Sequence, residues 1–232
     1  MPDREQIRGR GQGMRQVKRI GHSLLVAIGL LASACAATEE SIQKSQGYYQ
    51  EGVASLGGDR QKAFVAFQKA VQLNPKNKEA HYGLGHIYAL QGKLVQAEEE
   101  FRTAIKIDDA YSEAHTYLGQ VLASQGKLDE AIQSYRSALA NPLYATPDLA
   151  RFHLGRALAQ RGDLQEAMET LEDAVAANPA SVPPALTHLE LGRVYSKLGY
   201  TAKAREVLGK VKALDKNGEY ADAATELLAR LK

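Results

Sequence analysis

Small and apolar residues in the stretch 78–111 fall at helical spacing in two groups, with a polar Gly92-Lys93 break between them. The two groups are Leu84, Gly85 and Tyr88, then Ala97, Phe101 and Ala104. Residues three or four apart share one face of a helix, so each group predicts a helix with one packed face. The stretch as a whole predicts a helix, a tight turn and a second helix.

The same pattern returns along the chain at a spacing close to 34 residues. Later copies are Leu118, Gly119, Gly126, Ala131, Tyr135 and Ala138; Leu154, Gly155, Gly162, Ala167, Leu171 and Ala174; and Leu191, Gly192, Gly199, Ala204 and Leu208. An earlier copy, one residue shorter at its first glycine, is Tyr48, Gly52, Gly58, Ala63, Phe67, Ala70 and Pro75. Glycine inside a helix is unfavourable by about 1 kcal/mol relative to alanine, so its recurrence indicates close helix packing. We expect Gly85 and Ala97 to let two helices nest, with Phe101 and Tyr88 filling the wedge toward the next repeat. Five near-equal periods disfavour the alternative, a generic amphipathic bundle.

This periodicity and its small residues resemble the tetratricopeptide repeat family. The resemblance implies an all-α fold, a tetratricopeptide-repeat α-solenoid of about five helix-turn-helix repeats over residues 45–218. A final amphipathic segment, 219–232, is expected to form the capping helix that an open-ended stack needs.

The interval between repeats lengthens toward the C-terminus, to 36 residues from Gly119 to Gly155 and to 37 from Gly155 to Gly192. The extra residues fall in two proline-containing turns, 141–147 and 180–184. Thr146-Pro147-Asp148 predicts a helix start with a capping hydroxyl, and Pro184 predicts another. The longer turns are either tolerated loop variation or a part of a recognition surface.

The N-terminal 34 residues have the features of an export signal. Residues 15–19 are basic and residues 20–34 carry no charge, a run too short to span a membrane comfortably. We therefore assign residues 1–34 to a signal peptide, in which residues 1–13 are a mis-set start if Met14 is the true initiator.

The one cysteine of the chain, Cys35, follows Leu30-Leu31-Ala32-Ser33-Ala34, which resembles a bacterial lipobox, although Ala32 stands where leucine is commonest. That resemblance implies lipidation of Cys35, a lipidated N-terminus and tether over 35–44, and attachment to a membrane through lipid. The alternatives are an ordinary signal peptide cut near Ala34 and a retained membrane anchor. Because Ala36 is not aspartate, the resemblance implies a periplasm-facing lipoprotein of the outer membrane.

Charge and motifs argue against nucleic-acid binding and catalysis. From Cys35 onward the chain has 23 basic and 25 acidic residues, so no basic field points to nucleic acid. The histidines lack zinc-ligand spacing, and no phosphate loop or nucleophile motif is present. We expect no enzyme activity, no cofactor, no metal and no small-molecule substrate.

What remains is a protein-binding surface on the concave side of the solenoid. The family resemblance places its contacts on the first helix of each repeat, at the fifth and ninth positions: Tyr49 and Val53, Tyr82 and His86, Thr116 and Gln120, Phe152 and Arg156, and Leu189 and Arg193. This lining suits a peptide with apolar anchors and an acidic end. It lacks the lysine and asparagine of the carboxylate clamp found in chaperone-binding members. The alternative, considered evenly for Tyr49, Tyr82 and Phe152, is that these rings pack against the next helix.

A lipobox followed by this array, with the junction Leu143-Tyr144-Ala145-Thr146-Pro147, resembles the type IV pilus biogenesis lipoproteins known as pilotins. The resemblance spans most of residues 35–216. It implies that the protein partner is a secretin subunit, which the protein helps to reach or assemble in the outer membrane. The alternative is a lipoprotein scaffold for another envelope machine, in outer-membrane protein assembly or cell-wall synthesis.

Overall fold

The computed structural model describes residues 37–215 and 218–231, and within these ranges it contains eleven α-helices and no strand. The helices are α2 (Glu39–Ser55), α3 (Arg60–Leu73), α4 (Lys78–Leu90), α5 (Leu94–Ile107), α6 (Ser112–Ser124), α7 (Leu128–Leu139), α8 (Pro147–Arg161), α9 (Leu164–Val175), α10 (Pro184–Lys197), α11 (Thr201–Leu214) and α12 (Ala221–Arg230). Consecutive helices pack as five pairs, and each pair packs on the next. The predicted solenoid of five repeats with a capping helix is confirmed.

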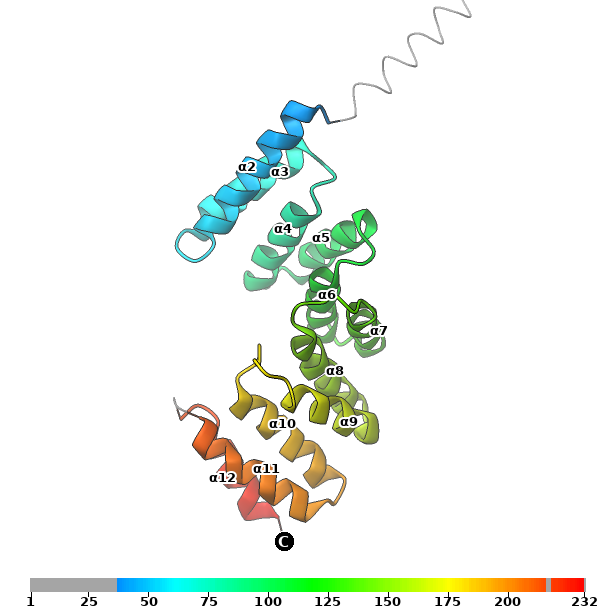
Figure 1. Ribbon diagram of the computed structural model, residues 1–232, viewed down its shortest axis with the longest axis vertical. Helices are drawn as coiled ribbons and strands as arrows, with labels where there is room; N and C mark the ends of the chain where they lie inside the picture. The colour runs from blue at the N-terminus through cyan, green and yellow to red at the C-terminus, as the bar shows by residue number, and fades with distance from the viewer. Residues whose placement is uncertain (1–36, 216–217, 232) are drawn as a thin grey trace, which may run out of the picture.

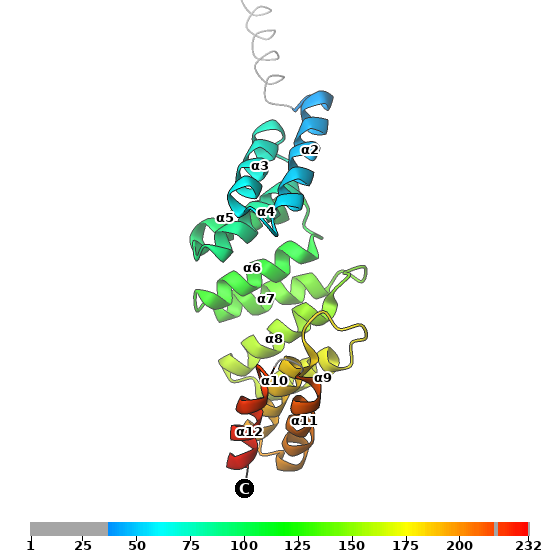
Figure 2. The ribbon, with the colours of Figure 1, turned by 90° about the vertical axis from the view of Figure 1, so that its left-hand side faces the viewer.

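The stack is elongated and curved (Figure 1). The first helices of the middle repeats, α4, α6 and α8, lie on the left in that view, and the second helices α5, α7 and α9 lie on the right. Both ends of the stack bend toward the left, so the first helices line the concave side. Figure 2 looks onto this side and shows α12 beside α10 and α11 at the end of the array.

Each repeat is closed by a large side chain of the second helix that packs on the recurring glycine of the first. A Cβ atom added at these glycines would lie only 2.5–2.8 Å from that side chain. The five pairs are Gly52 with Phe67, Gly85 with Phe101, Gly119 with Tyr135, Gly155 with Leu171, and Gly192 with Leu208. The inference of close packing from the repeated glycine is confirmed: the ring or leucine of the second helix packs on the glycine, and Ala97 is fully buried.

The aromatic residues between repeats behave partly as expected. Phe101 stacks on Tyr117 of the next repeat, with ring centroids 6.1 Å apart. Tyr88, however, meets Phe64 of the preceding repeat edge-on at 5.5 Å. Tyr88 also packs against the core cluster that contains Phe101 and Leu118, so it contacts the preceding repeat in addition to the side that the sequence indicated.

The first helix begins earlier than the sequence pattern indicated. Thr38 caps α2, because its hydroxyl oxygen accepts a hydrogen bond from the amide of Ser41 at 3.2 Å. Residues 39–44, expected to be part of a tether, are therefore the first turns of the array. The signal peptide 1–34 and the lipidation site Cys35 lie outside the described residues.

The two longer turns are held by buried polar side chains. Helix α8 starts at Pro147 as predicted, but the Thr146 side chain makes no capping hydrogen bond. Asp148 is instead buried and accepts a hydrogen bond from the amide of Ser181 at 2.6 Å, which ties the second long turn to the start of α8. In the first long turn the Tyr144 hydroxyl lies 2.9 Å from the Thr116 hydroxyl.

Helices α10 and α12 also follow the predicted boundaries. Helix α10 starts at Pro184, and α12 lies within the expected capping segment. The Asp215 carboxylate accepts hydrogen bonds from the amides of Tyr220 and Ala221 at 2.7 and 2.8 Å, which fixes the entry into α12. These contacts lower the pKa of Asp215, although its burial acts in the opposite direction.

The glycine packing predicts opposite effects for two glycine-to-alanine changes. Gly119→Ala places a Cβ 2.5 Å from the Tyr135 ring, so we expect it to lower the free energy of unfolding, by about 1–3 kcal/mol. Gly209→Ala, in helix α11, meets no atom within 4 Å and should be stabilising, by roughly 0.5–1 kcal/mol. Urea unfolding followed by circular dichroism measures both, and equal effects of the two changes would contradict the packing account.

Candidate functional site

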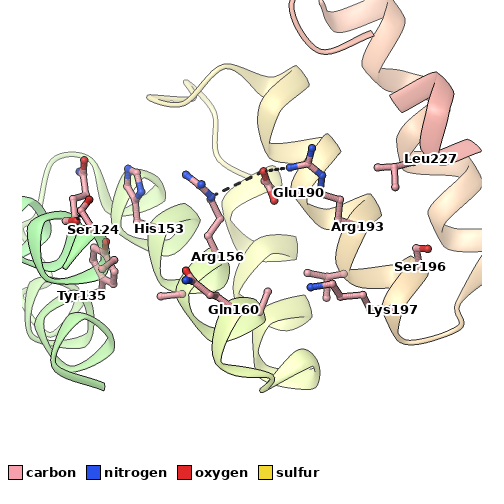
Figure 3. Close-up of a pocket in the computed structure, with 15 residues that line it drawn as sticks. Ser124, Tyr135, His153, Arg156, Gln160, Glu190, Arg193, Ser196, Lys197 and Leu227 are labelled. Atoms are coloured by element: carbon pink, nitrogen blue, oxygen red, sulfur yellow. Dashed lines mark hydrogen bonds and ion pairs between the residues drawn. The ribbon is translucent and has the colours of Figure 1, made fainter. Parts of the chain in front are cut away.

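A groove of about 720 Å³ lies on the concave side of the last three repeats (Figure 3). Helices α6, α7, α8, α10 and α12 all contribute to its lining. Its labelled side chains are Ser124, Tyr135, His153, Arg156, Gln160, Glu190, Arg193, Ser196, Lys197 and Leu227. The groove therefore spans several repeats and reaches the capping helix.

Charged side chains gather at the middle of this groove. The Glu190 carboxylate accepts a hydrogen bond from the Arg193 guanidinium at 2.7 Å, and the Nε atom of Arg156 lies 4.0 Å from the same oxygen (Figure 3). The Glu190 side chain is only 15% exposed, whereas the two arginines are about half exposed. Lys197 adds a third cation, one helical turn beyond Arg193. One largely buried carboxylate thus lies beside two arginines, and a third cation, Lys197, lines the same groove.

Two neutral rings form the wall of the groove beside α6. The rings of Tyr135 and His153 are stacked, with centroids 6.0 Å apart, and Phe152 meets His153 edge-on at 5.1 Å. Burial and, to a smaller extent, the nearby Arg156 charge together lower the pKa of His153 to about 4. Burial also raises the pKa of Tyr135. Both rings are uncharged at neutral pH, so the three cations determine the sign of the field in the groove.

The ten expected groove residues differ in exposure according to whether they stand at the fifth or the ninth position of their repeat. Among the ninth positions, Gln120, Arg156 and Arg193 line the groove just described. Val53 and His86 lie on the first helices of the N-terminal repeats, Val53 at 45% exposure and His86 half-buried. The ninth position therefore presents side chains to the concave surface.

The fifth positions are corrected. Thr116, Phe152 and Leu189 are buried core residues, at 0%, 2% and 3% exposure, and are not accessible to a ligand. The physical reason is that the fifth position points into the seam between helices, where Thr116 also donates a hydrogen bond to the Ser112 carbonyl at 2.9 Å. The alternative of packing against neighbouring helices thus describes Phe152 fully.

The remaining fifth positions, Tyr49 and Tyr82, are half-buried in aromatic clusters. The Tyr49 ring lies 6.0 Å from Phe67, and the Tyr82 ring lies 5.5 Å from both Tyr111 and Tyr117. Burial is the main cause of the raised pKa of both Tyr49 and Tyr82. The concave side of the N-terminal repeats is therefore aromatic, in contrast to the cationic groove of the C-terminal repeats.

Sequence reasoning missed several lining residues that share a repeat position. Ser124, Gln160 and Lys197 each lie four residues after a ninth-position residue, one helical turn further along the same face. That periodicity was available in the sequence. Leu227 had no comparable signal, because it belongs to the capping helix and reaches the groove through the packing of α12 on α10 and α11.

Among the described residues, no group of three or more histidine, cysteine, aspartate and glutamate side chains is placed to hold a metal ion. In the same part of the chain, no helix is long and apolar enough to cross a membrane. The arrangement that the structure does present is a wide groove with cationic, neutral aromatic and aliphatic sides, which can bind a polypeptide by shape and charge.

Two tetratricopeptide repeat family models match the chain, one over residues 96–148 and 118–182 and the other over residues 57–121 and 158–231. No curated protein is a match.

Several solved structures are similar. PilF of Pseudomonas aeruginosa is 20% identical, with a TM-score of 0.69 over 83% of this chain and 90% of its own. PilW, a widely conserved type IV pilus biogenesis factor, is 24% identical, with a TM-score of 0.71 over 80% and 86%. YrrB, with an unusual peptide-binding site, is 22% identical, with a TM-score of 0.62 over 82% and 100%. At these identities the likeness establishes the fold.

The half-buried His153 ring predicts a specific dependence of stability on pH. Its folded pKa, about 4, lies below the ordinary value of 6.5, so the unfolded chain binds a proton first as the pH falls. The contribution of the neutral His153 ring to the free energy of unfolding is complete above pH 6.5. It is lost as the pH falls toward 4, by up to about 3 kcal/mol. We expect His153→Phe, which keeps a neutral ring, to remove this part of the loss. Urea unfolding of parent and variant across that range measures it, and identical pH profiles would contradict the assignment.

Proposed function

We propose that this chain, which belongs to the tetratricopeptide repeat family, is a lipid-anchored scaffold of the bacterial envelope that holds a protein partner in its concave groove. The observation that carries the proposal is the groove itself, to which helices α6, α8 and α10 contribute polar or charged side chains that solvent can reach. Its volume, about 720 Å³, is large enough to receive several side chains of an extended or helical segment.

The shape of the fold supports a binding role rather than catalysis. Repeat arrays form extended concave surfaces because each repeat is rotated slightly relative to the previous one. Tetratricopeptide proteins bind protein partners, and the similar protein YrrB has a peptide-binding site. In this chain the accessible ninth positions and the residues one turn beyond them provide such a surface over the last repeats.

The finer proposal is a role in type IV pilus biogenesis, as a pilotin that binds the secretin and aids its localisation or assembly in the outer membrane. Two independent features favour it. The Leu30–Cys35 segment has the order of a lipobox, and the similar fold PilW is a type IV pilus biogenesis factor. The second candidate is a lipoprotein scaffold for another envelope machine, because the lipobox favours this role as much as it favours a pilotin.

Lipid attachment would give this scaffold a physical advantage. Each methylene buried in a membrane contributes about 0.8 kcal/mol, so one acyl chain binds reversibly and two or three hold durably. A partner held in the groove of an anchored protein is confined near the membrane surface, which raises its effective concentration for assembly. The lipid and the groove would thus act together: one sets the location and the other selects the client.

The anchor is tested by Cys35→Ala. We expect the full-length variant, produced in a bacterium with an outer membrane, to lose the acylated N-terminal peptide seen by mass spectrometry of the parent. The variant should also leave the outer-membrane fraction, because no thiol remains for lipid attachment. Cys35→Ala that fractionates with the outer membrane like the parent would refute the lipid anchor.

The groove is tested by a steric block. Ser124 is exposed at the rim on α6, so Ser124→Trp should obstruct the groove without disturbing the core. The matched control is Gln68→Trp, at an exposed position of α3 outside the groove. Affinity capture from membranes should recover an oligomeric secretin with the parent and the control, and at least about tenfold less with Ser124→Trp. Equal recovery by all three proteins would remove the groove from partner binding, and recovery of a different envelope protein would favour the second candidate.

A further inference from the structure

We infer that the groove selects a segment of its partner in which acidic side chains stand beside an aliphatic one, an inference that rests on the proposed function and specifies the chemistry of the partner. The recognition is assigned to Arg156, Arg193 and Lys197 for the acidic groups and to Leu227 for the aliphatic group.

The cations of the groove outnumber its anions by three to one. Glu190 is the one carboxylate in the lining, and both of its close cationic neighbours, Arg193 at 2.7 Å and Arg156 at 4.0 Å, share a single oxygen of it. Lys197 forms no ion pair within the described part of the chain. The groove therefore has an excess of two positive charges that its own residues do not neutralise.

The other titratable groups of the lining do not change this balance. His153 is neutral near pH 7 because burial holds its pKa at about 4, and Tyr135 is neutral because burial raises its pKa. Protonation of His153 in acid would add to the positive charge. The sign of the field is thus the same over the whole physiological range.

Glu190 offsets one of the three positive charges and also positions the two arginines. Its side chain is only 15% exposed and lies between the two arginines, whose side chains are 51% and 43% exposed (Figure 3). The Arg156 guanidinium also lies 5.5 Å from the centre of the Phe152 ring, which limits its movement. Two oriented guanidinium groups with free N–H donors can each bind a carboxylate through two hydrogen bonds.

An aliphatic wall stands next to the cationic centre. Leu227 projects from α12 toward the groove on the side of Ser196 and Lys197 (Figure 3). Val194 and Ala157 also line the groove and are buried. Leu227, Val194 and Ala157 therefore give the groove apolar surface that an aliphatic group of a partner can contact. A segment that alternates acidic and aliphatic residues matches both surfaces.

Charge also argues against occupation by the N-terminal segment of the same chain. Residues 1–34 carry six basic and two acidic groups, so the groove would repel them. The occupant favoured by the observations is therefore a partner with an acidic segment, and a second copy of the chain is an outcome that the experiment distinguishes.

The probe is a fluorescein-labelled peptide of alternating glutamate and leucine, titrated with the purified full chain and followed by fluorescence anisotropy. Two matched peptides carry glutamine or lysine in place of every glutamate. We expect the acidic peptide to bind at least about tenfold more tightly than the glutamine peptide, and its affinity to fall with added NaCl. Equal affinities of the acidic and glutamine peptides, or tighter binding of the lysine peptide, would overturn the inference.

Variants assign the binding to the groove. The double change R156Q/R193Q should reduce the affinity for the acidic peptide to that for the glutamine peptide, and Lys197→Gln alone should reduce it less. The matched control is Arg136→Gln, because Arg136 pairs with Glu166 at 2.6 Å and lies outside the groove lining. Retained affinity in the double variant would overturn the inference, as would loss in the control. Sedimentation of the chain without peptide completes the test: a dimer that R156Q/R193Q dissociates would make a second copy the occupant.

Capture from membranes separates this inference from the proposed function. A secretin captured by both the parent and R156Q/R193Q would leave the proposed function standing and overturn the acidic-segment inference. Arginine-dependent binding of the acidic peptide without any captured envelope protein would support the inference and reject the proposed partner. Loss of both in the double variant would support both.

Discussion

The contact between a glycine on the first helix and a ring or leucine on the second is the constraint on which this structure depends. Where Gly119 faces Tyr135, an additional Cβ would lie 2.5 Å from the ring, so the two helices can approach only because the side chain is missing. The Tyr135 ring is almost fully buried at 1% exposure, and it also stacks on His153 of the following repeat. One side chain therefore fixes both the packing within a repeat and the angle to the next. Repetition of this contact produces the curve of the array.

The curve decides which residues of each first helix reach the concave side. At the fifth position the side chain enters the seam, as the complete burial of Thr116 shows. At the ninth position, and one turn later, the side chain faces outward, as Arg156 and Gln160 show in the groove. A binding surface thus arises from positions that carry no structural demand, and these are free to differ in chemistry between repeats. In this chain the ninth positions are Val53 and His86 in the first two repeats and the cations Arg156 and Arg193 in the last two.

The sequence was sufficient for the fold because glycine weakens a helix unless another helix packs closely against it. Gly85 and its equivalents, spaced by one repeat, determined the number of repeats and the pairing of helices. Accessibility within the concave side was harder to predict, since Phe152 and Arg156 lie one turn apart on the same helix, yet Phe152 is 2% exposed and Arg156 is 51% exposed. Their exposure depends on packing between repeats, which a single sequence does not specify. The role of Leu227 was out of reach for the same reason, because it follows from where α12 docks.

The longer turns show how a departure from strict repetition is accommodated. Each leads into a helix of the groove: the turn with Tyr144 precedes α8, and the turn with Ser181 precedes α10. A longer loop alone would leave the direction of the following helix less constrained, since loop entropy rises with length. Buried polar contacts counter this. The hydroxyl of Tyr144 is held by Thr116, and the amide of Ser181 by Asp148, and a buried polar group left without its partner is unfavourable by roughly 1–3 kcal/mol. Helices α8 and α10 carry Arg156, Glu190 and Arg193. The polar contacts of Tyr144 and Ser181 fix the starts of these two helices, and they thereby help to set the spacing of the charged groups in the groove.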